Sequence, residues 1–232
     1  MKNPEKILKS VQICKSERQK ARESGNGGTN WPGKMAKEAY PDILNCVFED
    51  LDEIYCIIGT NGKTTTCRMI DNILNFAGID HIYNREGANL PEGLLTTLLL
   101  NYDDYCVPVK KKALLECDEI TFRDLSSVMS PKISGILIIS VWEYAPHDTE
   151  WMGHTDFTQL FSLFDEIYTS GPCITAKTFL RYPGVLWLEE KDISEKIYST
   201  EQNVTILTDY DGNIGIHKLL SKEGHLRQFW EE

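Results

Sequence analysis

The sequence predicts an α/β protein: a mostly parallel sheet flanked by helices, with a glycine-rich loop between one strand and the helix after it. The run at residues 53–58 is short, apolar and β-prone, and it ends at a glycine. Apolar residues at helical spacing follow over residues 63–77. Further apolar strand candidates lie at residues 112–117 and 133–141. Strands that alternate with helices in this way favour right-handed crossovers and parallel pairing.

The remaining elements can be assigned in chain order. Residues 1–23 carry apolar positions at helical spacing among charged ones, which predicts an amphipathic helix. Residues 23–33 are rich in Gly and Asn, which predicts a loop. We expect helices at about 35–49 and 93–100, short strands at 80–83, 184–188 and 204–208, and a turn at 209–212.

Length and charge limit the domain organisation and the partners. With 232 residues, of which 41% are apolar, the chain can bury one substantial core. We expect residues 1–50 to form an N-terminal helical and loop segment, and residues 51–232 to form the main domain. The formal charge of -11 would repel a nucleic-acid backbone, so we expect no nucleic-acid partner.

Targeting and cysteine patterns point to the cytoplasm. The N-terminus has no apolar signal-peptide core, and no stretch approaches the roughly 18 apolar residues of a membrane span. The chain has 7 cysteines and none forms a Cys-x-x-Cys pair. We therefore expect a cytoplasmic protein with reduced thiols, without a zinc site or a disulfide framework.

The segment Gly59-Thr60-Asn61-Gly62-Lys63-Thr64-Thr65 lies between the predicted strand and helix, which is the context of a phosphate-binding loop. Backbone N–H groups and the positive end of the helix would bind the phosphates of ATP. Lys63 would bridge the β- and γ-phosphates, and Thr64 would ligate Mg²⁺, with Thr65 as a second candidate. The alternative is a tight glycine turn followed by an exposed lysine.

A Mg²⁺ ion held by a threonine and phosphates needs a carboxylate at the carboxyl end of a nearby strand. Glu116 ends the apolar run of the strand predicted at residues 112–117, and Asp118 and Glu119 follow it. We therefore expect Glu116 to be a metal ligand. The alternative is a solvated acidic cluster at the end of a strand.

Four segments together resemble one known family. They are Ala21–Gly33 (Ala-Arg-Glu-Ser-Gly-Asn-Gly-Gly-Thr-Asn-Trp-Pro-Gly), Gly59–Thr66, Asn84–Pro91 (Asn-Arg-Glu-Gly-Ala-Asn-Leu-Pro) and Glu116–Glu119 (Glu-Cys-Asp-Glu). Their order and spacing over roughly residues 20–140 resemble the central ATPase domain of the Mur ligase superfamily, most closely the MurT family.

The resemblance implies ATP- and Mg²⁺-dependent amide formation. The γ-phosphoryl group would pass to a substrate carboxylate, of a peptidoglycan precursor or a γ-glutamyl compound, and an amine or ammonia would displace it. In the MurT family the ammonia comes from a glutaminase partner, GatD. The resemblance also implies that Lys63 and Glu116 are catalytic, and that Asn84 and Asn89 orient substrate or phosphate; as bare residues, both asparagines are equally typical of turns.

Some residues depart from the family pattern. Val141 stands where an Asn is expected, and His147 with Asp148 is a plausible substitute in reversed order, which makes His147 the third catalytic candidate. A surface polar pair is the alternative reading of His147 and Asp148. No cysteine spacing matches the zinc ribbon of many MurT proteins. The chain also ends near the expected end of the central domain, so the resemblance implies a partner chain that supplies the C-terminal domain.

Two functions of different classes follow. The first is an ATP-binding component of an ATP-dependent carbon–nitrogen ligase or amidotransferase. The second is a catalytically degenerate regulatory or assembly partner that keeps the Mur fold. An unrelated phosphate-loop kinase is a third reading, but it leaves the segment Asn84–Pro91 unexplained.

Overall fold

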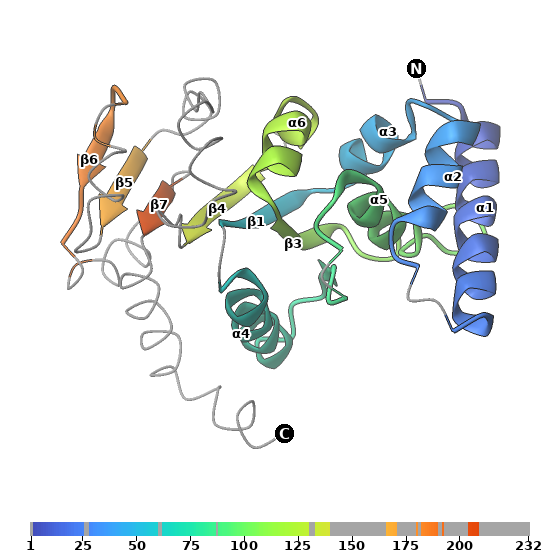
Figure 1. Ribbon diagram of the computed structural model, residues 1–232, viewed down its shortest axis with the longest axis horizontal. Coiled ribbons are helices and arrows are strands. Elements are labelled where there is room, and N and C mark those ends of the chain that lie inside the picture. The colour runs from blue at the N-terminus through green and yellow to red at the C-terminus, as the bar shows by residue number, and fades with distance from the viewer. Residues whose placement is uncertain are drawn as a thin grey trace. The chain divides into compact units, whose positions relative to one another are not determined.

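A computed structural model gives the arrangement of the chain. It describes residues 2–25, 28–59, 62–86, 88–129, 133–139, 166–170, 180, 182–189, 192 and 204–208. The chain divides into two compact units: unit 1 contains Met1–Ile54 and Ile79–Ile133, and unit 2 contains Tyr55–Gly78 and Ser134–Glu232. Figure 1 labels most of their helices and strands. The division proposed between residues 50 and 51 stays a prediction.

Unit 1 combines helices with a short parallel strand pair. Strand β2 pairs with β3 in parallel, with Ile82 opposite Ala113 and Tyr83 opposite Leu114. The elements are α1 (Pro4–Glu23), α2 (Trp31–Ala39), α3 (Ile43–Glu49), β2 (Ile82–Tyr83), α5 (Pro91–Leu99), β3 (Lys112–Cys117) and α6 (Glu119–Met129). The sequence did not predict α6.

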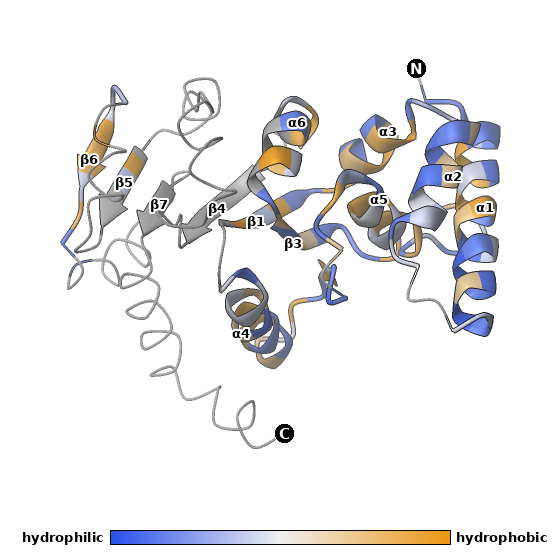
Figure 2. Cartoon of the chain, viewed as in Figure 1, coloured by the Kyte–Doolittle hydropathy of each residue, from blue (hydrophilic) through white to orange (hydrophobic). Residues whose placement is uncertain are grey.

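Helix α1 forms for local reasons and packs through one face. The Asn3 side chain accepts a hydrogen bond from the N–H of Lys6 at 3.1 Å and thereby caps the first turn. Ile7, Val11 and Cys14 follow at helical spacing and are buried, while most of the helix is hydrophilic (Figure 2). The amphipathic helix predicted at the N-terminus is therefore confirmed.

Helices α2 and α5 approach each other closely because two positions lack a side chain. A Cβ atom at Gly33 would lie 1.9 Å from the carbonyl oxygen of Glu92, and one at Gly93 would lie 2.6 Å from Oδ1 of Asn30. The N–H of Gly33 donates to Oγ1 of Thr96 at 2.8 Å. The segment predicted as a loop at residues 23–33 thus ends in a tightly packed helix start.

The single helix expected at about 35–49 is wrong, because α2 ends at Ala39 and α3 begins at Ile43. Tyr40 has φ -146° and ψ 97°, an extended conformation. It precedes Pro41, whose ring disfavours a helical conformation in the residue before it. The chain therefore turns between the two helices.

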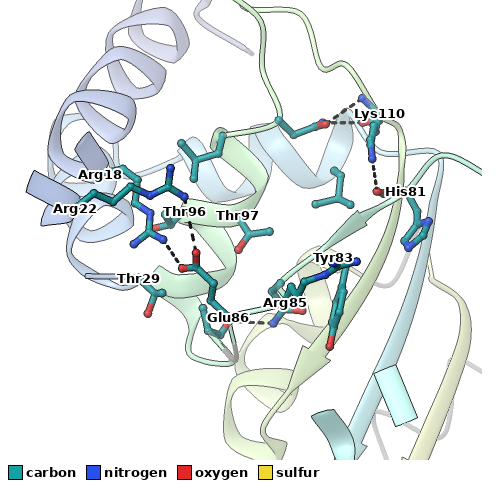
Figure 3. A pocket seen from close by; sticks show the side chains of 15 residues that line it. Arg18, Arg22, Thr29, His81, Tyr83, Arg85, Glu86, Thr96, Thr97 and Lys110 are labelled. Carbon is teal, nitrogen blue, oxygen red and sulfur yellow. Dashed lines mark hydrogen bonds and ion pairs between the residues drawn. The ribbon is translucent and has the colours of Figure 1, made fainter. Parts of the chain in front are cut away.

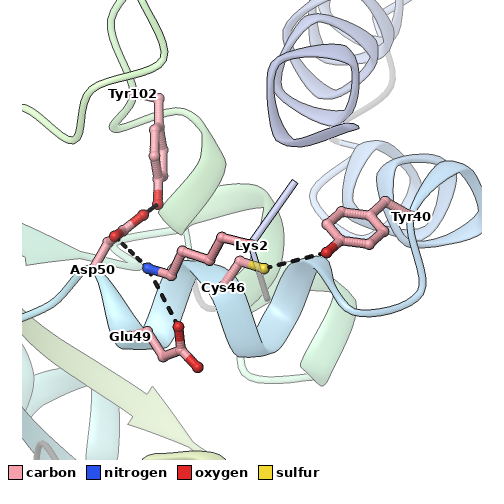
Figure 4. Close-up of polar contacts among 6 residues, drawn as sticks. All are labelled: Lys2, Tyr40, Cys46, Glu49, Asp50 and Tyr102. Atoms are coloured by element: carbon pink, nitrogen blue, oxygen red, sulfur yellow. Dashed lines mark hydrogen bonds and ion pairs between the residues drawn. The ribbon is translucent and has the colours of Figure 1, made fainter. Parts of the chain in front are cut away.

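A polar cluster secures the start of the chain against α3 and the segment after α5 (Figure 4). Asp50 accepts from Nζ of Lys2 at 2.5 Å and from the hydroxyl of Tyr102 at 2.6 Å. Burial, followed by the hydrogen bond to Asp50, raises the pKa of the Tyr102 hydroxyl far above its ordinary value. The raised pKa keeps the Tyr102 hydroxyl protonated, so it remains the donor of its hydrogen bond to Asp50 around neutral pH.

In the part of unit 2 that the structure describes, helix α4 (Lys63–Phe76) is present together with a parallel sheet. Its strands run in the order β4-β7-β5-β6, and each adjacent pair is parallel. The elements are α4 (Lys63–Phe76), β4 (Ile133–Ile139), β5 (Glu166–Ser170), β6 (Val185–Trp187) and β7 (Val204–Thr208). Strand β1 (Glu53–Gly59) contains the boundary between the units. The predicted parallel α/β class is confirmed.

Some predictions fall outside this picture. The sequence did not predict β5, and the predicted turn at residues 209–212 lies outside the described residues. Within the described part, every helix is too short or too polar to cross a membrane.

Candidate functional site

The loop between β1 and α4 depends on a left-handed residue. Gly62 has φ 84° and ψ -6°, which a residue with a Cβ adopts only at a cost. Its carbonyl oxygen accepts from the N–H of Thr66 at 2.9 Å and so starts the helix. Gly62 provides no side-chain cap for α4. The chain therefore passes directly from a strand into a helix, and the residue at the N-cap position itself carries no carboxylate or hydroxyl.

This helix start suits an anion. Lys63, Thr64 and Thr65 form the first turn of α4 and are half-buried, and that turn contains no acidic residue. The N-terminus of a helix carries partial positive charge, and its first N–H groups have no partner within the helix. Lys63 adds a full charge, and Thr64 and Thr65 add hydroxyl oxygens. Thr60 and Asn61 lie outside the described residues.

A second loop, at the end of β2, is held by Asn84. The side-chain Nδ2 of Asn84 donates to the carbonyl oxygens of Ala88 at 3.0 Å and Glu116 at 2.7 Å. Its Oδ1 accepts from the N–H of Glu116 at 2.8 Å. Both amide hydrogens of this buried side chain are therefore used, and Asn84 connects its own loop to the end of β3.

This geometry bears on the two asparagines expected to orient a ligand. Asn84 has no further amide hydrogen to donate, so its bonds favour the turn-forming alternative. Asn89 is half-buried in the same loop. The sequence did not predict the direct contact that the structure shows between Asn84 and Glu116.

Glu116 is buried near the end of β3, with only 3% of its surface exposed. A carboxylate in such a place is costly unless charges or donors compensate it. Asp118, two residues on, has a different task, because its Oδ1 accepts from the N–H of Thr121 at 2.6 Å. Asp118 therefore caps α6, and Glu116 is the better metal candidate of the two.

The predicted site residues are divided between the units. Gly62 to Thr65 lie in unit 2, while Asn84, Asn89 and Glu116 lie in unit 1. His147, Asp148 and Val141 lie outside the described residues. Among the residues that the structure describes, no three His, Cys, Asp or Glu side chains gather as a metal-binding group. A Mg²⁺ site of one threonine, one carboxylate and phosphates needs no such group.

Unit 1 also contains a pocket of about 330 Å³ that the sequence did not predict (Figure 3). Its lining includes four cationic side chains and one carboxylate: Arg18, Arg22, Arg85, Lys110 and Glu86. These residues come from α1, from the turn after β2 and from the segment before β3. Because they are scattered along the chain, no spacing pattern reveals them.

Comparison with known proteins supports the family resemblance. The chain is 36% identical over 124 residues to the lipid II isoglutaminyl synthase (glutamine-hydrolyzing) subunit MurT of Staphylococcus aureus (strain COL), covering 53% of this chain and 28% of that protein. The corresponding subunit of Streptococcus pneumoniae (strain ATCC BAA-255 / R6) is 32% identical over 106 residues, covering 46% of this chain and 23% of that one. The matched region thus spans about a quarter of the length of these relatives.

No protein-family profile matches the chain. Among solved structures, MurF from Acinetobacter baumannii aligns with a TM-score of 0.47 and 13% identity, over 67% of this chain and 34% of MurF.

The parallel sheet and the sequence relatives define the class: the chain is a Mur ligase-like α/β protein. Within that class it is close to MurT. The resemblance predicted from its four motifs is confirmed.

Proposed function

We propose that the chain binds ATP with Mg²⁺ at Gly59–Thr65 and serves as the ATP-binding component of a MurT-like amide-forming ligase. The observation that carries the proposal is the left-handed Gly62 at the start of α4, with Lys63 and two threonines in the first turn and no acidic residue there. This is the arrangement that a triphosphate requires. The similarity to MurT subunits supports the reaction class.

The role that we assign to the chain is to position the reacting groups and to neutralise the charge on the phosphates. Lys63 offsets the charge that develops as the γ-phosphoryl group passes to a carboxylate oxygen, and ADP leaves. Ammonia or an amine then attacks the carbonyl carbon, and phosphate leaves as the amide bond forms. Mg²⁺ supplies neutralisation of the phosphate oxygens. Thr64 and Glu116 are the proposed ligands, since they offer the hard oxygen atoms that this ion prefers.

The substrate, partner and location are proposed from the relatives. Their names specify lipid II, glutamine hydrolysis and a subunit. We accordingly assign a carboxylate of a peptidoglycan precursor, or a γ-glutamyl compound, as the acceptor. A glutaminase would supply ammonia, and a further chain or segment would complete the site. Such a reaction takes place in the cytoplasm, where ATP is available.

Titration calorimetry with a non-hydrolysable ATP analogue, with and without Mg²⁺, tests the nucleotide site. Lys63→Ala should strongly weaken binding of the analogue. Glu116→Gln should remove only the increase in affinity that Mg²⁺ causes. Arg68→Ala is the matched control, because Arg68 is an exposed cation on the same helix. Equal affinity for the wild type and Lys63→Ala would refute the assignment.

A non-catalytic assembly partner is the second candidate. It is favoured by Val141, which stands where the resemblance expects an Asn. An amidation assay that combines the chain with a glutaminase, glutamine, ATP and lipid II separates the two functions. ATP-dependent amide formation supports the ligase component, whereas nucleotide binding without turnover in the full mixture supports the assembly partner.

A further inference from the structure

We propose that the pocket of unit 1 is a second anion site, distinct from the phosphate loop, which binds a small phosphate or diphosphate group, and that Glu86 competes with this ligand. The pocket is lined by residues of unit 1 only, whereas Gly62 and Lys63 belong to unit 2. The proposal therefore stands or falls independently of ATP binding at the loop.

The first argument is the local charge. The chain as a whole has a formal charge of -11, yet the side chains lining this pocket carry four positive charges against one negative charge. A concave surface with one sign of charge concentrates counter-ions of the opposite sign. A cationic hollow in an acidic protein is thus a local feature that the overall composition does not produce.

The second argument is the state of Arg18. Its side chain is only 7% exposed and forms an ion pair with Glu86, whose side chain is 54% exposed. A buried guanidinium group requires a charged partner, because an uncompensated charge in the interior is costly. That partner lies on a turn open to solvent. A ligand with two negative charges can take its place without leaving Arg18 uncompensated.

The third argument is the geometry around Glu86. Arg22 also reaches this carboxylate, with 3.8 Å between Nη2 and Oε1, so Glu86 lies between two guanidinium groups from the same face of α1 (Figure 3). Guanidinium groups bind phosphate oxygens through paired N–H donors. Two of them on one carboxylate form a site that a phosphate group would fit equally well.

The rest of the pocket supports a small polar ligand. Lys110 lies on the far side, where its Nζ donates to the carbonyl oxygen of His81 at 2.9 Å. The guanidinium carbon of Arg85 lies 5.9 Å from the centre of the Tyr83 ring. The volume of about 330 Å³ is at the lower end of the range for small-molecule sites. It suits a phosphate or diphosphate group better than a complete nucleotide.

The test is calorimetry of the whole chain with inorganic pyrophosphate at low salt. Lys63→Ala is the background variant, so that the phosphate loop contributes no binding. On this background, Arg22→Gln should weaken pyrophosphate binding by about tenfold, because it removes one charge-assisted contact. Glu86→Gln should strengthen binding by about the same factor, because it removes the competing carboxylate.

Control variants and other anions make the test decisive. Lys9→Gln removes an exposed cation from the same helix and should leave the affinity unchanged. Inorganic phosphate should bind, and succinate, a dicarboxylate, should bind at least tenfold more weakly than pyrophosphate if phosphoryl oxygens are recognised.

Three outcomes would overturn the proposal. They are no pyrophosphate binding on the Lys63→Ala background, an equal loss in Lys9→Gln and Arg22→Gln, and a Glu86→Gln variant that loses stability without binding more tightly. The last outcome would leave Glu86 with a structural role alone.

Discussion

The loops after β1 and after β2 both carry motifs of the same family, yet they use their polar groups in opposite ways. In the loop after β2, Asn84 donates both amide hydrogens and accepts one, all within the protein. In the loop after β1, Gly62 starts α4 and has no side chain with which to cap it. In one loop a motif asparagine is used for internal hydrogen bonds, and in the other a motif glycine and lysine form the positively charged start of a helix.

The difference separates two kinds of motif residue. An asparagine whose hydrogen bonds are all internal contributes to folding, and its substitution should reduce stability. A lysine in the first turn of a helix places a positive charge beside the helix N-terminus, which suits an anionic ligand, so its substitution should affect binding more than stability. Substitutions in the loop after β1 should therefore change nucleotide affinity, and substitutions in the loop after β2 should change the free energy of unfolding.

The largest effect is expected at Lys63. Lys63→Ala should weaken binding of an ATP analogue by about a hundredfold, or about 3 kcal/mol, through the loss of charge-assisted contacts to phosphate. The free energy of unfolding of the unliganded chain should fall by no more than about 1 kcal/mol, a typical value for a single substitution. Calorimetry and urea denaturation measure the two quantities. A large loss of stability would contradict the contrast between the loops.

Asn84→Ala should give the reverse result. The backbone groups of Glu116 and Ala88 would lose their partners in a buried place, so the free energy of unfolding should fall by about 2–3 kcal/mol. Urea denaturation measures the loss. Affinity for the ATP analogue without Mg²⁺ should remain within about threefold of wild type, a change below 1 kcal/mol. Asn89→Ala, in the same loop, is the control and should lower the free energy of unfolding by much less.

Gly62→Ala tests the left-handed turn and has a matched partner in the same unit. Gly62 has φ 84° and Gly78, just beyond α4, has φ 70°. An alanine at either position should destabilise the chain by about 1–2 kcal/mol. Only Gly62→Ala should also weaken nucleotide binding, since Gly78 follows the other end of the helix. If the two variants bound the nucleotide with equal affinity, the left-handed turn at Gly62 would not be part of the ligand site.

The smallest effect concerns two buried thiols, one in each unit. Cys14 and Cys67 both have 0% exposure. Burial raises the pKa of Cys14 to about 12, so this thiol stays protonated at pH 8.5, where an ordinary thiol is about half ionised. Alkylation then requires local opening. A nucleotide at about twice its Kd should slow the labelling of Cys67 by about threefold and leave Cys14 unchanged, as mass spectrometry would report.

The sequence predicted the elements whose cause is local. The strand at residues 53–58 follows from a short apolar, β-prone run, and the helix after Gly62 and the first helix follow from periodicity. The structure contains them as β1, α4 and α1. Helix α6 was missed because its acidic start was read as a metal segment, whereas Asp118 caps the helix. The helix at 35–49 was extended through Pro41 although the residue before a proline disfavours helix.

The candidate site was predictable only where one continuous segment forms it. Gly59–Thr65 is such a segment, so its pattern was visible in the sequence. Two of the three hydrogen bonds of Asn84 depend on the backbone of Glu116, which is distant in the sequence. The cationic pocket depends on Arg18 and Lys110, which are brought together by folding. Such contacts have no signature in local spacing.

The close contact of α2 with α5 has a consequence for mutational libraries. A selection for expression alone would deplete every substitution at Gly33, because any side chain there meets the carbonyl oxygen of Glu92. Lys34, the next residue, is exposed and would accept most substitutions. Gly33 would thus show the invariance that is often attributed to a binding residue, although its cause is the distance between two helices.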